Sequence, residues 1–309
     1  MSKVDVLELK TNQEEADTKM FLCAAHVQGS ETVCIHTVDS DIAIYAMYFQ
    51  ERLRSSLYIK IGTGSHSRTI DVMEVTRVLG RKICRALPAL KIFSGDDYIS
   101  AFHGLGKVKF FKLMIGSKEY QKIFGKLGNS FIFDTSLFAS LQKFVCQLYG
   151  LKKCVTVDEA RYLKFIAKEK PPEPQRLPPT ADALLCHVKR VSYVTAVVKR
   201  SLESMPAIPS PVDNTYEGAG TTYGWQINGD GDLELEWMLR SPAPNDLLRV
   251  ISCKCKGNCN SRACSCNAKG ISCSSMCECE GCENIFDDND NEHDENSDDE
   301  YEEESFVEL

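Results

Sequence analysis

The sequence predicts an α/β body built on a parallel sheet, followed by a helical extension, a small cysteine-rich module and an acidic tail. Apolar patterns typical of helices and of strands alternate from residue 13 onward. Nine of the fifteen cysteines lie between Cys253 and Cys282, and residues 287–309 hold thirteen Asp and Glu with no Lys or Arg. We therefore expect five parts. They are a body (1–130), a helical extension (131–205), a linker and lead-in (206–250), a cysteine module (251–285) and a disordered tail (286–309).

The body begins with an amphipathic pattern over residues 13–27 that predicts a helix. The residues expected on its buried face are Ala16, Met20, Cys23, Ala24 and Val27. The β-branched run TVCIHTV then predicts a buried parallel strand that ends at Asp39. The segment IAIYAMYF is typical of a helix, and SLYIKI is typical of a second strand. Strands that alternate with helices favour a parallel sheet with helices on both faces.

After the second strand, Ser67 or Thr69 can cap a helix that carries Asp71 and Glu74 in its first turn. A third apolar segment, ALKIFSG, closes with a turn. Three later segments predict helices: SLFASLQKFVCQLYG, DEARYLKFIAKEK and ADALLCHVKRVSYVTAVVKRSLESM. Residues 205–224 are rich in Pro, Gly and Thr and predict a linker, and GWQINGDGDLELEWM predicts a hairpin or an extended lead-in.

Net charge and the distribution of cysteines bear on whether the protein contacts nucleic acid and whether it is intracellular. The formal net charge is −8, but without residues 287–309 the chain has 36 basic and 31 acidic residues. Such a mildly basic body permits contact with nucleic acid without demanding it. No apolar run approaches the length of a membrane span, so no membrane partner is expected. The N-terminus has no secretion signal, and Cys23, Cys34 and Cys84 lie among apolar neighbours, which predicts reduced core cysteines in an intracellular protein.

The nine clustered cysteines follow the spacing C-x-C-x3-C-x4-C-x-C-x6-C-x3-C-x-C-x2-C, which predicts a metal cluster. Zinc takes four sulfur or nitrogen ligands, and this run contains no histidine. Three zinc ions need twelve ligand positions, which nine cysteines supply if three of them bridge two ions each. The alternative is a disulfide-rich module, although secreted frameworks usually hold an even number of cysteines. The predicted ligands are Cys253, Cys255, Cys259, Cys264, Cys266, Cys273, Cys277, Cys279 and Cys282.

The run CKCKGNCNSRACSCNAKGISCSSMCECEGCEN resembles the tesmin-like CXC domain, a nine-cysteine, three-zinc module that binds DNA in its family. The resemblance implies three zinc ions and DNA contacts, for which Lys254 and Arg262 are the candidates. The family usually carries a tyrosine before the second C-x-C pair, where this chain has Ala263. The zinc-loaded module would carry a net charge of about −2, which attracts phosphate weakly. A folding staple or a protein-docking surface is therefore the alternative.

Carboxylates follow the strand and helix patterns of the body. Asp39 ends the first strand, Asp41 opens the next helix, and Asp97 follows ALKIFSG. Glu15 and Asp17 open the first helix. Ligands of parallel α/β sheets bind beyond the carboxyl ends of the strands, so these side chains can converge. Gathered carboxylates need Mg²⁺ or Mn²⁺ to neutralise them, and two such ions can promote phosphodiester cleavage. The alternative is that these residues only cap helices.

The segments QEEADTKM, HTVDSDIAIYA and SGDDYISAFHGLGKVKFFKLM together resemble the flap endonuclease and PIN-like nuclease superfamily. They are most similar to the divergent PIN-like domains of transposon-derived eukaryotic proteins, which also end in a cysteine cluster. The resemblance implies that the metal ligands of the family match Glu15, Asp17, Asp39, Asp41 and Asp97. The family begins with a strand that ends in an essential Asp, and we expect that strand to be missing from this chain.

The turn from His103 to Lys107, HGLGK, is followed by a lysine-rich helix. In the resembling family, such a G-x-G turn exposes backbone amides to a DNA phosphate, because glycine lets the backbone approach closely. A lysine-rich surface can also serve solvation alone. The candidate DNA contacts here are Gly104, Gly106, Lys107, Lys109 and Lys112.

These patterns together predict a nucleic-acid-associated protein with a nuclease-like body. If active, it would hydrolyse phosphodiesters with Mg²⁺ or Mn²⁺. The alternative is a catalytically inactive module that binds DNA or proteins. The acidic tail lacks the apolar residues needed to offset the entropy of ordering, and it could dock on basic chromatin proteins. The resemblance implies a nuclear protein.

Overall fold

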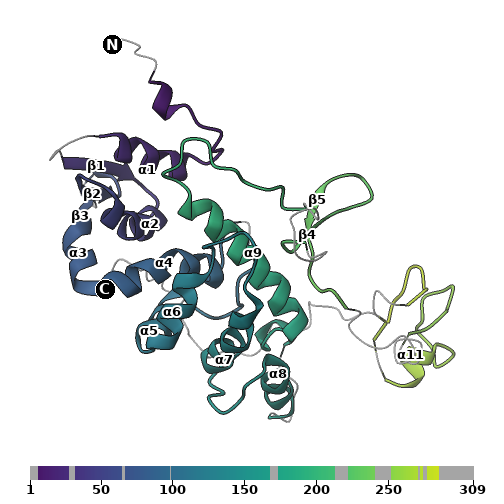
Figure 1. Cartoon of the computed structure of the whole chain (residues 1–309). Helices are drawn as coiled ribbons and strands as arrows, with labels where there is room; N and C mark the ends of the chain where they lie inside the picture. The colour runs from purple at the N-terminus through teal and green to yellow at the C-terminus, as the bar shows by residue number, and fades with distance from the viewer. Residues whose placement is uncertain are drawn as a thin grey trace. The chain divides into compact units, whose positions relative to one another are not determined.

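The computed structural model describes residues 6–27, 32–64, 67–97, 99–167, 173–212, 222–240, 252–270, 272–273 and 277–284. The chain is a mixed α/β protein that divides into two compact units, with the boundary after Trp237 (Figure 1). We call residues 6–237 the body and residues 252–284 the cysteine module, and each is described by itself. The predicted acidic tail, 286–309, lies outside the described residues. Within the described part, no helix has both the length and the apolar character to cross a membrane.

The body contains a three-stranded sheet in the order β1-β2-β3. β1 (Thr32–Thr37) and β2 (Ser56–Ile61) pair in parallel and are joined by α2 (Asp41–Phe49), so the predicted strand-helix-strand unit is confirmed. β3 (Arg68–Asp71) pairs antiparallel with β2, which makes the predicted helix cap at Ser67 or Thr69 wrong. The cap is Asp71 at the end of β3, whose carboxylate accepts a hydrogen bond from the Glu74 amide.

Helices cover the sheet on one face only in the described part of the chain. Leu57, Ile59 and Ile61 of β2 are buried, whereas Lys60 between them is exposed. Cys34 and His36 of β1 are exposed on that same open face. The predicted helices on both faces are therefore wrong. The first helix after β3 contacts β2, and the later helices pack mainly on α2 and on one another.

The first helix, α1 (Ala16–His26), buries a face that matches the predicted one only in part: Ala24 is buried and Met20 partly buried, whereas Ala16 and Cys23 are exposed. Its buried residues are Thr18, Phe21, Leu22 and Ala24. The Phe21 ring packs against Phe49 at 4.8 Å, and this large apolar side chain determines which face turns inward. Cys23 is consequently exposed. Of the three cysteines predicted to lie in the core, only Cys84 is buried.

Helix α3 (Val72–Leu79) leads into α4 (Arg81–Ser94), the central helix of the body. ALKIFSG is the C-terminal end of α4, and α4 closes at Gly95, whose φ of 127° favours glycine. Every residue from Ala86 to Ser94 is buried. The Phe93 ring lies within 6.3 Å of the rings of Phe102, Phe110, Phe124 and Phe144, which form the centre of the core.

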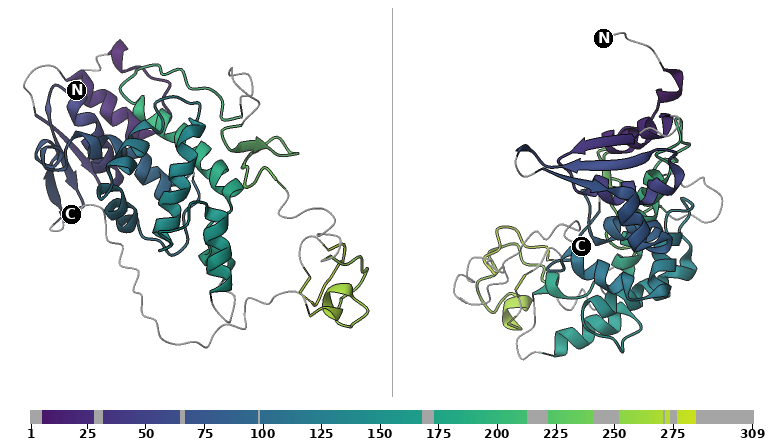
Figure 2. Two further views of the ribbon diagram at one scale, coloured as in Figure 1. Left: turned by 60° about the horizontal axis from the view of Figure 1, so that its bottom comes forward. Right: turned by 90° about the vertical axis from the view of Figure 1, so that its left-hand side faces the viewer.

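The remaining helices pack around α4. They are α5 (Lys107–Ile115), α6 (Lys118–Lys126), α7 (Phe138–Leu148), α8 (Val157–Ile166) and α9 (Ala181–Lys199), with 3-10 turns at Leu7–Leu9, Gln50–Arg52, Thr135–Leu137 and Pro174–Arg176. The three helices predicted after residue 130 are confirmed, although α9 ends at Lys199, before the predicted end. α9 runs beside α4 and α7 (Figure 1 and Figure 2).

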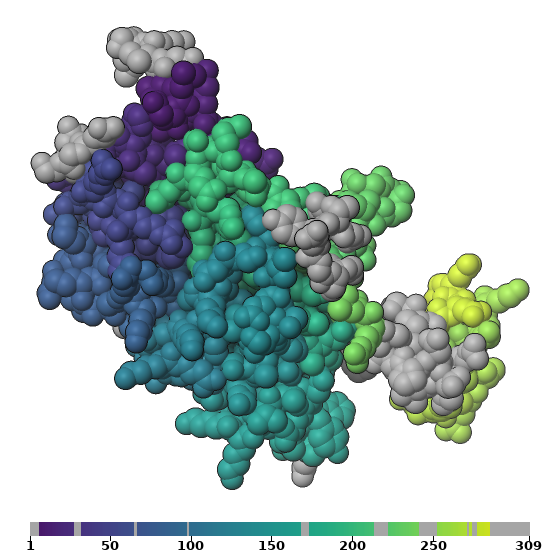
Figure 3. All heavy atoms as spheres, in the orientation of Figure 1, coloured from purple at the N-terminus to yellow at the C-terminus, as the bar shows by residue number. Residues whose placement is uncertain are grey.

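The first described residues of the predicted linker pack on the body. The Asn12 side-chain amide donates to the Pro206 carbonyl, and the Tyr193 hydroxyl donates to the Pro209 carbonyl. Figure 3 shows this green segment lying against the N-terminal residues. The predicted hairpin is confirmed as β4 (Trp225–Ile227) and β5 (Leu233–Leu235). Arg190 of α9, 1% exposed, donates to the carbonyls of Gly224 and Glu236 and thereby fixes the hairpin to the helix.

The cysteine module has one short helix, α11 (Ser265–Ala268), and otherwise irregular backbone. Backbone hydrogen bonds join its segments: Glu278 N–H donates to Cys253 O, and Glu283 N–H donates to Asn258 O. Its buried side chains are cysteines: Cys253, Cys259, Cys264, Cys266 and Cys273. The described interior of the module is therefore sulfur instead of hydrocarbon.

Candidate functional site: a cysteine cluster and a carboxylate pocket

The module cysteines converge into three overlapping groups of four, in each of which all sulfur atoms lie within 4.8 Å of one another. Cys253 belongs to all three groups, and Cys259, Cys264 and Cys273 belong to two each. The groups are Cys253, Cys264, Cys266 and Cys273; Cys253, Cys259, Cys273 and Cys279; and Cys253, Cys255, Cys259 and Cys264. Three overlapping sets of four sulfurs, which draw on seven of the nine cysteines, are thus brought together by the fold.

The sulfur distances fit zinc. Four sulfurs about 2.3 Å from one zinc ion lie about 3.8 Å from one another. The Sγ atoms of Cys253 and Cys259 are 3.8 Å apart, as are those of Cys253 and Cys273. The separation is 3.9 Å for Cys264 and Cys273, and 3.7 Å for Cys266 and Cys277. A disulfide requires about 2.05 Å, and all nine cysteines are free thiols. The cluster is therefore compatible with zinc and not with a disulfide framework.

Local backbone geometry prepares Cys264 to act as a ligand. Cys264 occupies the N-cap position of α11, and the Asn267 backbone amide lowers the pKa of its thiol to about 6. The thiolate is the form that binds metal. Cys259 has a positive φ of 57°, an uncommon conformation for a residue with a side chain. This turn places its sulfur in the buried centre of the module.

The predicted DNA contacts of the module lie on its surface. Lys254 and Arg262 are exposed, as is Ala263. The Lys254 ammonium lies 3.5 Å from the Glu278 carboxylate, with both side chains largely exposed. Such a surface pair leaves the lysine accessible to another anion.

In the body, the five predicted carboxylates line one pocket of about 620 Å³. Glu15 and Asp17 come from the start of α1, Asp39 and Asp41 from the junction of β1 and α2, and Asp97 from the turn after α4. The Asp39 carboxylate accepts a hydrogen bond from the Asp41 amide at 2.7 Å and so starts α2. Asp96 also lines the pocket.

Lys91 lies among these carboxylates, and sequence reasoning missed it. Its ammonium is 2.9 Å from Asp41 Oδ2 and 3.0 Å from Asp96 Oδ1. Burial disfavours the ammonium form, but Tyr45, Asp41 and Asp96 outweigh this effect and raise the pKa of Lys91. The signal in the sequence was a single charge in the otherwise apolar stretch ALPALKIFS. A lysine inside such a helix needs an acidic partner.

The carboxylates share a pocket without forming a compact ligand set. Among the described residues, only cysteines bring three or more ligand atoms within 4.8 Å of one another. Burial raises the pKa of Asp17, and the negative charges of Asp39 and Glu15 add to this effect. The pocket therefore gathers carboxylates without presenting them as a preassembled ligand set.

The predicted G-x-G turn lies at the start of α5. Gly104 has a φ of 71°, and Gly106 is the N-cap of α5. An added Cβ at either glycine would meet no atom within 4 Å, so both face open space. Lys107 lies 3.8 Å from Asp41 Oδ1, which brings the turn to the carboxylate pocket. Lys109 and Lys112 are exposed on α5.

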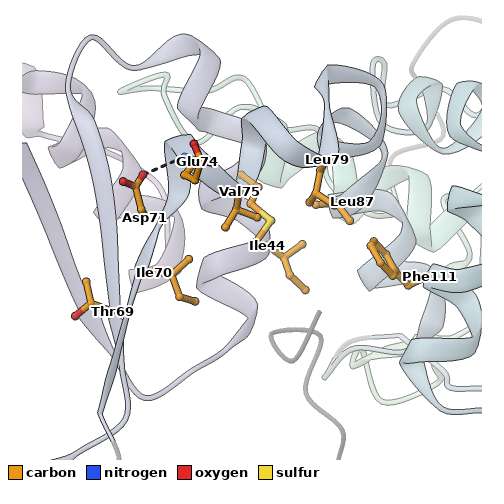
Figure 4. A pocket seen from close by; sticks show the side chains of 10 residues that line it. Ile44, Thr69, Ile70, Asp71, Glu74, Val75, Leu79, Leu87 and Phe111 are labelled. Atoms are coloured by element: carbon orange, nitrogen blue, oxygen red, sulfur yellow. Dashed lines mark hydrogen bonds between the residues drawn. The ribbon is translucent and has the colours of Figure 1, made fainter.

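A separate cavity of about 330 Å³ lies between β3, α3 and the helices behind them (Figure 4). Its lining is mainly apolar and includes Ile44, Val75, Leu87 and Phe111. The hydrogen bond between Asp71 and the Glu74 amide lies at its edge. None of the predicted site residues lines this cavity.

Comparison with known proteins adds no relative: no family model, no curated protein and no solved structure matches the chain significantly. The class of site therefore rests on the geometry alone. The described part of the chain defines a mixed α/β protein with a preassembled cysteine cluster of the kind that holds zinc.

Proposed function

We propose that the chain is a zinc protein that associates with nucleic acid, and that its nine module cysteines hold three zinc ions. The observation that carries this proposal is the set of three overlapping groups of four sulfurs, which draw on seven of the nine cysteines. Three tetrahedral ions require twelve ligand positions, so nine cysteines supply them only if some sulfurs bridge two ions, as overlapping groups allow. The 3.7 Å approach of Cys277 to Cys266 brings a further cysteine to the cluster.

DNA is the proposed partner of the module. Lys254 and Arg262 present positive charge at its surface, and the cysteine spacing resembles a DNA-binding family. The test is a gel-shift titration of the zinc-loaded full chain with duplex DNA at several salt concentrations. We expect Arg262→Ala to weaken binding and to lower the salt slope by about one, as for a lost phosphate contact. Ala263→Tyr restores the residue usual in the resembling family and is expected to tighten binding. A zinc-loaded chain that binds no DNA would refute this part.

A second candidate function is metal-dependent phosphodiester hydrolysis in the body. It is favoured by the pocket that Glu15, Asp17, Asp39, Asp41 and Asp97 line. A bound Mg²⁺ or Mn²⁺ would supply an activated water and neutralise the leaving oxygen. The carboxylates would hold the cation, and Lys107 with the open turn at Gly104 and Gly106 would hold the DNA phosphate beside it.

The test is incubation of the zinc-loaded chain with labelled flap and single-stranded DNA in Mg²⁺ or Mn²⁺. Cleavage that is lost in Asp97→Asn and Asp39→Asn is the expected result for an active site. Gly106→Ala is a matched probe of the turn, because its Cβ meets no atom within 4 Å and its φ of −68° suits alanine. Retained DNA binding without cleavage would instead favour an inactive binding module, the alternative function.

The resemblance to PIN-like domains of transposon-derived proteins supports three further proposals. We propose a PIN-like body of transposon-derived type, a nuclear location, and basic chromatin proteins as partners of residues 286–309. The thirteen acidic residues of that segment would attract such partners at low salt. Retention of histones on the immobilised full chain, and its loss when residues 286–309 are deleted, is the corresponding test.

A further inference from the structure

Lys199, the last residue of α9, is a buried lysine whose partners are all neutral. It is 8% exposed. Its ammonium donates to the carbonyls of Gly125 and Leu127 at 3.1 Å and 2.5 Å, and to the side-chain oxygen of Asn129 at 2.9 Å. No carboxylate among the described residues lies within 4.0 Å of it. Its hydrogen bonds are therefore satisfied, but its charge is not neutralised.

Two arginines beside Lys199 are held against buried aromatic rings. The Arg52 guanidinium carbon lies 4.6 Å from the centroid of the Tyr48 ring, and the Lys199 ammonium lies 5.8 Å from the same centroid. The guanidinium carbon of Arg200 lies 4.4 Å from the centroid of the Phe131 ring. Stacking on a ring orders a guanidinium group and leaves N–H donors at its edge for a further partner.

Negative charge is scarce around these side chains. Glu51 pairs with Arg81 at 2.8 Å and lies 3.9 Å from Arg85 of α4, with both arginines exposed. In the described part of the chain, no carboxylate lies within 4.0 Å of the guanidinium group of Arg52 or Arg200. One carboxylate thus faces a cluster of arginines.

The effect on Lys199 shows that these positive charges lie close enough to repel one another. Burial, together with the positive charges of Arg52, Arg200 and Arg85, lowers the pKa of Lys199 to about 7. Like charges that gather in this way destabilise the charged form of each group, and a bound anion would relieve the repulsion.

The arrangement of the arginines favours an extended polyanion over a small enclosed ligand. Arg52 lies in the 3-10 turn after α2, Arg85 on α4, and Arg200 directly after α9. None of the three lines the carboxylate pocket or the apolar cavity described above. Guanidinium groups bind phosphate through two parallel hydrogen bonds, and three of them from separate elements suit the repeated phosphates of a nucleic-acid backbone.

We propose that Arg52, Arg85 and Arg200 form a phosphate-contact surface by which the body itself binds the backbone of a nucleic acid. The inference rests on the proposed association with nucleic acid and deepens it, because it adds a contact that uses neither the module nor the turn at Gly104 and Gly106. Contacts of this kind position a duplex without reading its sequence.

The test is a fluorescence-anisotropy titration of labelled duplex DNA with the zinc-loaded full chain at several salt concentrations. We expect Arg52→Gln, Arg85→Gln and Arg200→Gln each to weaken binding by about five- to tenfold at 0.1 M salt and to lower the salt slope by about one. Arg176→Gln is the matched control. It removes an exposed arginine that already pairs with Glu173, and should change neither quantity.

The outcomes separate this surface from the proposed function. DNA binding with unchanged affinity and salt slope in all three variants would overturn the surface and leave the association with nucleic acid standing. A wild-type chain that binds no DNA would overturn both. Anionic phosphatidylserine vesicles are the second probe, and vesicle binding lost in the variants while DNA binding persists would overturn the nucleic-acid assignment.

Folding of the variants is checked by their urea midpoints. Replacing Arg52 or Arg200 also removes a stacking contact, so either variant can lose stability for that reason alone. Arg85 makes no ring contact among the described residues, and its side chain is 51% exposed. Arg85→Gln therefore decides the test if the other two variants do not fold.

Discussion

The body and the cysteine module differ in what fills their interiors. The body is built on a continuous apolar core in which Phe93 contacts four other phenylalanine rings. The described interior of the module consists of cysteine side chains. Apolar burial stabilises the body, whereas clustered thiols bury little apolar area and gain stability when a metal ion ligates them. One chain thus combines a unit packed around hydrocarbon with a unit packed around sulfur.

The two sites differ in the same way. Cysteine sulfurs lie 3.7–3.9 Å apart, near the spacing that zinc imposes. The pocket carboxylates form no such group among the described residues, and a lysine occupies part of their space. The cluster is therefore ready for metal, whereas the pocket has already compensated part of its charge from within.

The largest expected effect comes from Cys253, which all three sulfur groups share. Cys253→Ser should remove more than one zinc ion and unfold the module, since structural zinc sites contribute roughly 10 kcal/mol. Cys255→Ser, in one group only, is the matched control and should cost about one ion. Zinc content by mass spectrometry measures both. Equal losses of zinc in the two variants would contradict the sharing of Cys253. A shift in the unfolding transition of the body would show that the two units are not stabilised independently.

Acid should destabilise the body through His187. Its Nε2–H donates to the Phe93 carbonyl, its Nδ1 accepts from the Ser100 hydroxyl, and burial lowers its pKa to about 3. The unfolded chain, with a histidine pKa of about 6.5, takes up this proton first. Stability from this group is therefore present above pH 6.5 and is lost as the pH falls toward 3, by up to about 5 kcal/mol.

Urea unfolding of the body as a function of pH measures this loss. His187→Gln should remove this contribution to the slope, and His103→Gln, an exposed histidine, should keep it. An unchanged slope in His187→Gln would show that the carboxylates alone cause the acid sensitivity.

Gly224 is expected to have a moderate effect. It has a φ of 92°, and an added Cβ would lie 2.6 Å from the Cys186 carbonyl oxygen and 2.8 Å from Arg190 Cγ. Gly224→Ala should destabilise the body by about 1–3 kcal/mol through strain and crowding. Gly229→Ala, where a Cβ meets nothing within 4 Å, should change stability little. Equal urea midpoints for the two variants would show that the hairpin is not fixed to α9 in this way.

The smallest effect is expected at the surface pair of Lys254 and Glu278. Both side chains are largely exposed, so Glu278→Gln should change module stability by less than about 1 kcal/mol. Zinc content should stay the same. A large loss of zinc in this variant would mean that charge at the surface, and not sulfur, holds the module together.

Sequence patterns were most informative where local chemistry decides the structure. Alternating and apolar runs predicted β1, α2, β2 and the later helices correctly. They failed at Cys23 and Cys34, because which side of an element is buried depends on partners such as Phe49 that are distant in the sequence. They also failed at β3, since the pairing of Ile70 with Ile59 is a contact between strands and not a local signal.

At the candidate sites, too, contacts between distant residues could not be predicted from the sequence. Cysteine spacing predicted that ligands must be shared, but it could not tell that Cys253 lies in all three groups. The carboxylates were chosen by motif order, and the structure places them around one pocket without testing their role. Lys91 was missed because an isolated lysine has no motif, and its meaning depends on Asp41 arriving from α2.

The central claim is that the module is a zinc cluster with shared thiolates. The most direct test is the zinc-to-chain ratio of the purified, reduced full chain, measured by inductively coupled plasma mass spectrometry together with amino-acid analysis. The account predicts three zinc ions per chain, released by a strong chelator while the unfolding transition of the body stays in place. Two ions would mean two separate four-cysteine sites, and a chain without zinc but with paired cysteines would contradict the account.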